Sequence, residues 1–249
     1  MNSKEYLSRI NYIPKPTADL NTLGNLHKKH VYSIPFENLD IQNKTEIKLE
    51  KNHLFNKVVK NFRGGFCYEL NYLFSFLLNE LGFDVNLISA QIFDNEKLGP
   101  EFDHMAIIVH LNGEKFLVDV GFGDLFMKPL GVENSDIQFD GRNFFKIKNI
   151  ENRSFLLEMS TNGNDFEKKY NFTIEEQVIQ AFSEQCSYKQ RSESSYFVKN
   201  KIVTLPTENG RKTIFNSKYI VKNDGIKSEL NIESKKQEKK ILEVEFNIK

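Results

Sequence analysis

The sequence predicts an α+β fold in which helices come first and antiparallel strands follow. Up to residue 83, apolar residues recur at the spacing of amphipathic helices. From residue 84 on, short apolar runs alternate with turn residues such as Asn112-Gly113. Several short strands of this kind favour a barrel or a sandwich. We therefore expect three regions, residues 1–83, 84–190 and 191–249, the first helical and the second rich in strands.

Composition narrows the functional classes before any motif is considered. The 34 Lys and Arg residues balance 34 Asp and Glu residues, which argues against nucleic acid or an anionic membrane surface as a partner. The N-terminus shows no apolar signal-peptide core, and no apolar run reaches membrane-spanning length. Two cysteines do not make a disulfide framework. We expect a cytoplasmic globular protein large enough to bury a substantial core.

The first region contains two predicted helices before its glycine pair. The first covers residues 17–33, with Thr17 as its N-cap. Pro35 then interrupts the helical pattern, and residues 48–62 repeat it. The apolar residues of the first helix are Leu20, Leu23 and Leu26.

A third helix follows Gly64-Gly65 and covers residues 66–83, with Gly82 as its predicted stop. Its apolar stripe is too wide for a surface helix, so this helix must be buried. The stripe consists of Leu70, Leu73, Phe74, Leu77, Leu78 and Leu81.

Strand patterns begin at residue 84. The clearest is a hairpin over residues 104–123, in which Asn112-Gly113 is the two-residue signal of a type I′ turn. Residues 174–191 are predicted as a helix or crossover and residues 233–249 as a final helix. The other predicted strands lie within residues 84–93, 143–150, 154–160, 168–173 and 196–223.

The hairpin turn places two polar side chains near each other. With Asn112 and Gly113 as the loop, Asp119 lies opposite Ala106. Side chains alternate between faces, so His104 lies on the same face as Ala106. His104 and Asp119 are then diagonal neighbours across the two strands, close enough to meet. Both faces are otherwise apolar, so we expect the hairpin to be buried on both sides.

Two interpretations of this pair are open at this point. A buried carboxylate needs a partner, and a His–Asp hydrogen bond that only holds the sheet together meets that need. The alternative is a catalytic pair. The hairpin alone supports both interpretations about equally.

Cys67 favours the catalytic interpretation. The two glycines before it allow a tight turn and a close approach to a ligand. Cys67 then falls in the first turn of the third helix, where free N–H groups favour a thiolate and can form an oxyanion hole. His104 is a suitable base there, and Asp119 would orient its ring. A lone cysteine is more often a buried small hydrophobe, which is our interpretation of Cys186.

The other polar candidates carry less weight. His27, His30 and His53 lie in predicted helices among Lys and Asn residues, where a solvated face is expected. No spacing typical of a metal site occurs, so no metal is expected. Gly121 and Gly123 do not form a dinucleotide-binding fingerprint, and we expect them to let a ligand pass close to the backbone.

Four segments of the chain form a specific combination. They are "IPFENLDI" (34–41), "RGGFCYELN" (63–71), "DHMAIIVHLNGEKFLVDVGFGD" (103–124) and "SSYFVKN" (194–200). Together they resemble the arylamine N-acetyltransferase family. The order and spacing are consistent through residues 12–216, whereas the C-terminal tail matches only loosely.

The resemblance implies a fold, a catalytic triad and a reaction. The three regions would be an N-terminal helical bundle carrying the nucleophile, a central antiparallel β-barrel carrying the histidine and the aspartate, and a C-terminal α/β lid, around a papain- or transglutaminase-like cysteine core. The implied triad is Cys67, His104 and Asp119. The implied reaction is ping-pong transfer of an acetyl group from acetyl-CoA, through an acetyl-cysteine, to an arylamine, an arylhydrazine or an N-hydroxyarylamine.

The resemblance also implies pocket residues. Phe36 and Phe197 stand where the family has pocket aromatics, and Phe122-Gly123 stands where the family lines the acyl and acceptor site. Core packing is the other interpretation of these aromatic residues. Asp124 departs from the family pattern and places a negative charge beside the implied coenzyme A path. A role in xenobiotic metabolism is implied, but neither the physiological acceptor nor the oligomeric state follows from the sequence.

Two other functional classes are compatible with these residues. One is a Cys–His–Asp enzyme of another reaction class, such as an amide synthase with a carrier-bound acyl donor, a transglutaminase-like amidase or a thiol protease. The other is a binding protein that keeps the triad without using it.

Overall fold

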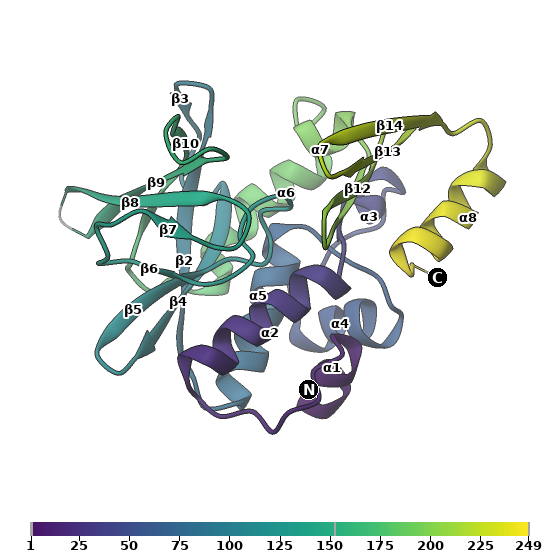
Figure 1. Cartoon of the computed structure of the whole chain (residues 1–249). Coiled ribbons are helices and arrows are strands. Elements are labelled where there is room, and N and C mark those ends of the chain that lie inside the picture. The colour runs from purple at the N-terminus through teal and green to yellow at the C-terminus, as the bar shows by residue number, and fades with distance from the viewer. Residues whose placement is uncertain (1, 152, 249) are drawn as a thin grey trace.

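The computed structural model describes residues 2–151 and 153–248. Helices α1, α2 and α4 lie beneath a barrel and a second, smaller sheet, α3 lies beside that smaller sheet, and the C-terminal helix covers it (Figure 1). No helix in the described part of the chain is long and apolar enough to cross a membrane. The first-third helices are α1 (Ser3–Arg9), α2 (Leu20–Ser33), α3 (Leu39–Gln42), α4 (Lys51–Phe55), continued by a π-helical turn (Asn56–Lys60), and α5 (Cys67–Glu80).

Helix α2 begins later than predicted. Asp19, not Thr17, is its N-cap, and the Asp19 carboxylate accepts a hydrogen bond of 2.7 Å from the Thr22 backbone N–H. The Thr17 hydroxyl donates to the same carboxylate instead. Leu20, predicted within the apolar stripe, is 46% exposed because it starts the helix before the buried face begins.

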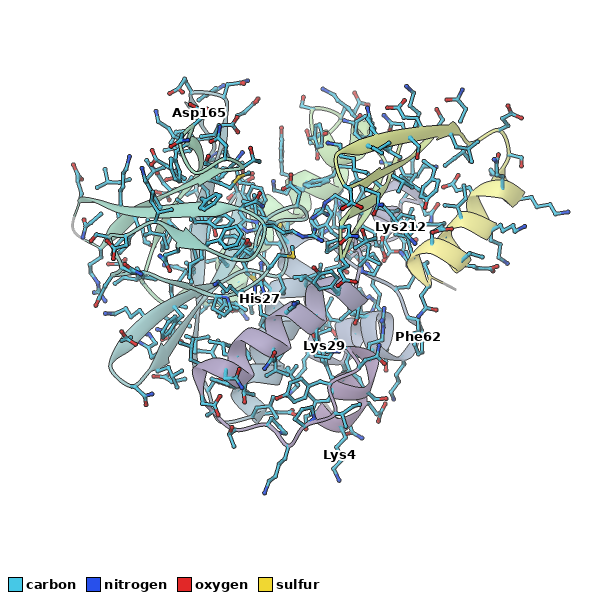
Figure 2. All side chains as sticks on the ribbon, in the orientation of Figure 1. Lys4, His27, Lys29, Phe62, Asp165 and Lys212 are labelled. Carbon is cyan, nitrogen blue, oxygen red and sulfur yellow. The ribbon has the colours of Figure 1, made fainter. Side chains whose placement is uncertain are left out.

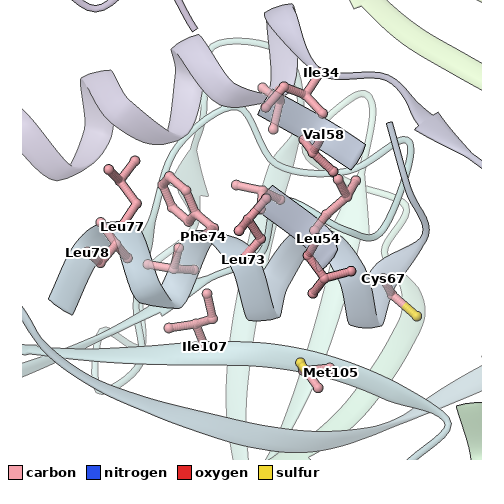
Figure 3. Packing of buried hydrophobic residues seen from close by; sticks show 14 of the residues in the cluster. Ile34, Leu54, Val58, Cys67, Leu73, Phe74, Leu77, Leu78, Met105 and Ile107 are labelled. Carbon is pink, nitrogen blue, oxygen red and sulfur yellow. The ribbon is translucent and has the colours of Figure 1, made fainter. Parts of the chain in front are cut away.

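Helix α5 has the predicted buried stripe and the predicted stop. It lies between the other helices and strand β4 (His104–Leu111), and Figure 3 shows Leu73, Phe74 and Leu77 in that layer. Gly82 has a φ of +89°, a left-handed conformation that glycine adopts without strain at a helix end.

A nine-stranded antiparallel sheet forms a nearly closed barrel, with strand order β6-β5-β4-β2-β10-β9-β8-β7 and β3 paired to β2. The Gln138 side chain in β7 joins the two ends of that order, because its amide donates to and accepts from the Gly131 backbone in β6, each at 2.8 Å. Besides β4, the strands are β2 (Asp84–Asp94), β3 (Lys97–Leu98), β5 (Glu114–Val118), β6 (Leu130–Gly131), β7 (Gln138–Phe139), β8 (Phe144–Glu151), β9 (Ser154–Ser160) and β10 (Glu167–Thr173).

The central hairpin has the predicted register and burial. Ile108 pairs with Leu117, and both φ angles at Asn112 and Gly113 are positive, as a type I′ turn requires. One face of β4 packs on α5 and the other fills the barrel. The α5 side consists of Met105, Ile107, Val109, Val118 and Val120, and the barrel side of Ala106, Ile108 and Leu117.

The C-terminal part differs from the prediction at two places. In residues 174–191, a 3-10 turn (Ile179–Phe182) and α6 (Ser183–Arg191) begin only at residue 179, and residues 174–178 are not helical. Residues 196–199, predicted as strand, form one helical turn, α7 (Tyr196–Lys199), because the Ser195 hydroxyl caps it by accepting from the Phe197 N–H.

The second sheet has the order β1-β11-β12-β13-β14. Its first strand, β1 (Phe36–Glu37), was missed because it is two residues long and follows Pro35. The predicted final helix is confirmed as α8 and packs Phe246 on this sheet. The remaining elements are β11 (Ile202–Thr207), β12 (Gly210–Phe215), β13 (Lys218–Asn223), β14 (Ile226–Asn231) and α8 (Lys235–Phe246).

Gly64→Ala and Gly24→Ala should change the free energy of unfolding in opposite directions. A Cβ on Gly64 would lie 2.0 Å from the Pro35 carbonyl oxygen, so the chain must shift, at a cost of about 1–3 kcal/mol. A Cβ on Gly24, inside α2, meets no atom within 4 Å and should stabilise the helix by about 0.5–1 kcal/mol. Urea unfolding measures both, and equal stabilities of Gly64→Ala and the wild type would contradict the steric argument.

Candidate active site

Cys67 is the first residue of α5 and is only 4% exposed. Its position at the end of a helix leaves first-turn N–H groups without partners inside the helix. Figure 3 shows its sulfur at that end, beyond the apolar stripe of α5. Glu69 caps the same turn, because its Oε2 accepts from the Phe66 N–H at 3.2 Å.

The two glycines before Cys67 admit protein backbone rather than a ligand. Gly65 accepts a hydrogen bond of 2.9 Å from the Glu37 N–H of β1. A Cβ on Gly65 would lie 2.9 Å from the Glu69 side chain. The expected close approach is therefore real, but its partner is strand β1 and the cap of α5.

A buried charge network anchors the start of α5. Lys57 contacts Asp40 and Glu69 at 2.7 Å each, and Arg63 contacts Glu37 and Asp40 at 2.8 Å each. Burial lowers the pKa of Lys57, but the surrounding carboxylates outweigh it and raise that pKa above its ordinary value. Burial raises the pKa of Glu69 to about 7. These pairs tie the motifs at residues 34–41 and 63–71 together.

His104 and Asp119 meet as the hairpin register predicts. His104 Nε2 lies 2.7 Å from Asp119 Oδ2, and both residues are 1% exposed. Burial lowers the pKa of His104, but the Asp119 charge and hydrogen bond outweigh it, and with a smaller effect of Cys67 they raise the pKa to about 10. The imidazole is therefore held as a cation against the carboxylate.

Cys67 completes the cluster. The Cys67 side chain adds to the rise in the His104 pKa, so the thiol lies close enough to interact with the ring. Because Nε2 faces Asp119, Nδ1 is the ring nitrogen that can exchange a proton with the thiol. The three side chains predicted from the sequence are thus together, in an arrangement that can activate a thiol nucleophile.

Two further side chains hold the Asp119 carboxylate. Asn71 Nδ2 donates to Oδ1 at 2.8 Å, and Tyr170 donates to Oδ2 at 3.3 Å. The Gly121 N–H also donates to Oδ1, at 2.9 Å. Burial raises the pKa of Asp119, but the charge and hydrogen bond of His104, together with the bonds from Asn71 and Gly121, outweigh it and lower the pKa below its ordinary value. Sequence reasoning named neither Asn71 nor Tyr170 as a site residue.

The loop after Asp119 packs tightly on the helix start. A Cβ on Gly121 would lie 2.9 Å from the Cys67 Cα, so the predicted room for a ligand at Gly121 is occupied by backbone. Gly123 has a φ of +96°, and a Cβ there would lie 3.4 Å from the Phe36 ring. Both glycines therefore serve close packing beside the triad.

The predicted aromatic residues lie around this cluster. The Phe36 and Phe197 ring centroids are 6.0 Å apart, and Phe66 lies 5.9 Å from Phe197. Phe122 packs edge-on against His104 at 5.3 Å. A cavity of about 10 Å³ lined by Phe36 and Gly123 lies beside them, room for no more than about one water.

The prediction that three helical histidines are exposed to solvent is wrong for two of them. His27 and His30 are fully buried, and only His53 is exposed. His27 Nε2 donates to the Asp119 backbone carbonyl at 3.1 Å. Cys186 is buried as expected, and burial raises its pKa to about 12. The described residues hold no group of three or more His, Cys, Asp or Glu side chains arranged for a metal.

His104 should make stability fall as the pH rises through the alkaline range. Its pKa is about 10 in the folded protein and about 6.5 when unfolded, so its contribution is complete below about pH 6.5 and disappears toward pH 10. The test uses a Cys67→Ala background, which removes thiol titration. Between about pH 7 and pH 9.5, the free energy of unfolding of Cys67→Ala should fall more than that of Cys67→Ala with His104→Gln, and the two falls should differ by more than about 1 kcal/mol. Urea unfolding at both pH values tests this, and parallel pH dependences would contradict it.

Comparisons with known proteins give the family. A family model described as N-acetyltransferase matches residues 19–249. The pineal gland isozyme NAT-10 of arylamine N-acetyltransferase from Gallus gallus is 30% identical over 273 residues, covering 100% of this chain and 94% of that protein.

Solved structures share the fold. The arylamine N-acetyltransferase of Mycobacterium smegmatis has a TM-score of 0.91 at 28% identity, covering 100% of this chain and 93% of that one. The Mycobacterium marinum arylamine N-acetyltransferase in complex with CoA has a TM-score of 0.89 at 23% identity, covering 99% and 93%. With a family match over most of its length and a full-length relative at 30% identity, the chain belongs to the arylamine N-acetyltransferase family of acyltransferases.

Proposed function

We propose that the chain transfers an acetyl group from acetyl-CoA to an arylamine, an arylhydrazine or an N-hydroxyarylamine, with Cys67 as the nucleophile. The main supporting observation is the buried His104 ring, which is bonded to Asp119 at 2.7 Å and whose pKa the nearby Cys67 side chain also raises. The names of the similar proteins, and the CoA bound to the Mycobacterium marinum enzyme, support the donor and the acceptor class.

The first half-reaction loads Cys67. The cycle starts from a Cys67 thiolate beside the His104 imidazolium, whose Nδ1 already carries the proton of the thiol, and the thiolate attacks the thioester carbonyl carbon of acetyl-CoA. First-turn N–H groups of α5 stabilise the oxyanion. The bond between the acetyl carbon and the CoA sulfur breaks, His104 returns its proton to that sulfur, and free CoA leaves behind an acetyl-Cys67.

The second half-reaction regenerates the enzyme. The amine nitrogen attacks the acetyl carbonyl of Cys67 and gives up a proton to His104. The acetyl–sulfur bond breaks, which releases the amide and leaves a thiolate beside the imidazolium. Asp119 stays ionised throughout, because its carboxylate stabilises the positive charge on His104 in both steps.

The aromatic residues around the triad form the proposed acceptor pocket, consisting of Phe36, Phe122, Gly123 and Phe197. The small cavity beside Phe36 is too small for an aromatic amine, so in this proposal one of these rings moves aside when the acceptor binds. Phe197 is the proposed mobile ring because it lies on the short helix α7 and is only partly buried. Asp124, which departs from the family pattern, is exposed, and its charge acts on Arg211 of β12. The negative charge beside the pocket is therefore partly balanced.

We place the reaction in the cytoplasm and propose acetylation of xenobiotic amines as its context. A thiol nucleophile must stay reduced, and a reducing compartment provides that condition. Both cysteines are free and buried.

Incubation with acetyl-CoA should add the mass of one acetyl group, located at Cys67 by peptide mass spectrometry. Cys67→Ala should show no gain and no turnover, because no other group supplies the nucleophile. Cys186→Ser is the matched control and should be acetylated like the wild type, since burial raises the pKa of Cys186 to about 12. Folded wild-type protein that takes up no acetyl group would refute the proposed function.

Phe197→Ala should weaken acceptor binding without slowing donor chemistry. Loss of its ring contacts should raise the KM for an arylamine about two- to tenfold, as expected for one aromatic contact of about 0.5–1.5 kcal/mol. The rate at which acetyl-CoA loads Cys67 should stay at the wild-type value. Phe139→Ala is the control, since Phe139 lies on the barrel strand β7 and is 46% exposed. An equal KM change in both variants would exclude Phe197 from the pocket.

A further inference from the structure

Helix α2 brings a second histidine to the backbone of Asp119. His27 is fully buried, and its Nε2 lies 3.1 Å from the Asp119 carbonyl oxygen. Because a carbonyl oxygen only accepts, the His27 ring donates through a protonated Nε2. Figure 2 shows His27 in the interior of the molecule, where α2 faces the barrel.

The hydrogen bond from His27 is one of three that fix the backbone of residues 119–121, the loop after β5. Asp119 follows the last residue of β5, so its carbonyl lies outside the strand ladder. The next two N–H groups donate to side chains at 2.9 Å. Val120 donates to Asn71, and Gly121 donates to the Asp119 carboxylate. Without His27, the carbonyl of Asp119 would be the one polar group of this set left buried without its bond.

His27 supplies this hydrogen bond without adding charge. Burial lowers the pKa of its ring to about 4, although the nearby Asp119 and Asp140 act in the opposite direction. The ring is therefore neutral at physiological pH. A cation here would compete with His104 for the charge of Asp119, whereas a neutral donor leaves that pair undisturbed.

We propose that His27 is a positioning residue for the triad, which holds the Asp119 main chain and thereby directs its carboxylate at His104. This inference rests on the proposed role of Cys67 as the nucleophile. Loss of the bond leaves a buried carbonyl unpaired, so the loop moves to find a partner and the Asp119 carboxylate moves with it. Displacements of about 1 Å at a catalytic group cost large factors in reactivity.

His30 provides a matched control on the same helix. It is as buried as His27, and its Nδ1 lies 2.9 Å from the Tyr6 hydroxyl. Its ring packs edge-on against Phe74 at 5.0 Å. His30 therefore serves the packing of α1, α2 and α5 and makes no bond to the Asp119 loop.

The test compares two substitutions of His27 whose amide nitrogens extend to different distances from the backbone. In His27→Gln the amide nitrogen extends about as far as Nε2, whereas in His27→Asn it is too short to reach the Asp119 carbonyl. The rate of Cys67 alkylation by iodoacetamide is measured against pH on the full chain, together with urea unfolding. His27→Asn should lower the alkylation rate at neutral pH about tenfold and raise the midpoint pH by about one unit. His27→Gln should recover most of the rate.

The control and the contrary outcomes make the inference falsifiable. His30→Asn should lower the free energy of unfolding but keep the wild-type alkylation profile. A folded His27→Asn with the wild-type profile, or an equal shift in His30→Asn, would overturn the inference. His27→Phe, which has no donor at all, replaces His27→Asn in the test if His27→Asn does not fold. Failure of acetyl-CoA to load wild-type Cys67 would refute the proposed function instead, so the two failures are distinguishable.

Discussion

The buried carboxylate of Asp119 sets the arrangement of the elements around it. An ionised carboxylate away from water costs several kcal/mol unless donors surround it. Its four donors come from different places, namely His104 on β4, Asn71 on α5, Tyr170 on β10 and the N–H of Gly121 in its own loop. These bonds form together only when α5 packs on the face of β4 that points away from the barrel interior. The requirement to satisfy one charge therefore joins the helical layer to the sheet at the point where chemistry is proposed.

A second polar network acts on the same helix from its other side. Lys57 and Glu69 form a buried pair at 2.7 Å, and Glu69 also caps the turn that begins at Cys67. The start of α5 is thus held between the Asp119 cluster and this network. A sulfur placed there has little freedom to move, which is the preorganisation that a nucleophile requires. Because the Cys67 side chain is short, this precision comes from its neighbours and not from its own contacts.

Contacts between residues close in sequence could be predicted, whereas contacts between distant segments could not. The turn at Asn112 predicted the contact of His104 with Asp119, because a two-residue hairpin loop determines the register. Asn71 was within reach of the same reasoning, since it lies four residues after Cys67 on one helix face. The burial of His27 could also have been predicted, because His27 lies four residues after Leu23 on the same helix face. The lysines that follow it in the sequence favoured a solvated face instead. No pattern in the sequence indicated Tyr170, because its position near Asp119 depends on pairing between strands that are distant in sequence.

The side-chain bridge of Gln138 to Gly131 bears on the order in which the protein folds. The two edges that this bridge joins are neighbours in sequence, so their meeting costs little loop-closure entropy. The pairing of β2 with β10 joins segments that are far apart in sequence, so it has the higher cost in loop-closure entropy. Tyr170 reaches Asp119 only through that pairing, whereas His104 reaches it within a hairpin. We therefore expect the His–Asp pair to form early during folding, and the thiol to gain its full reactivity only in the last, slow step.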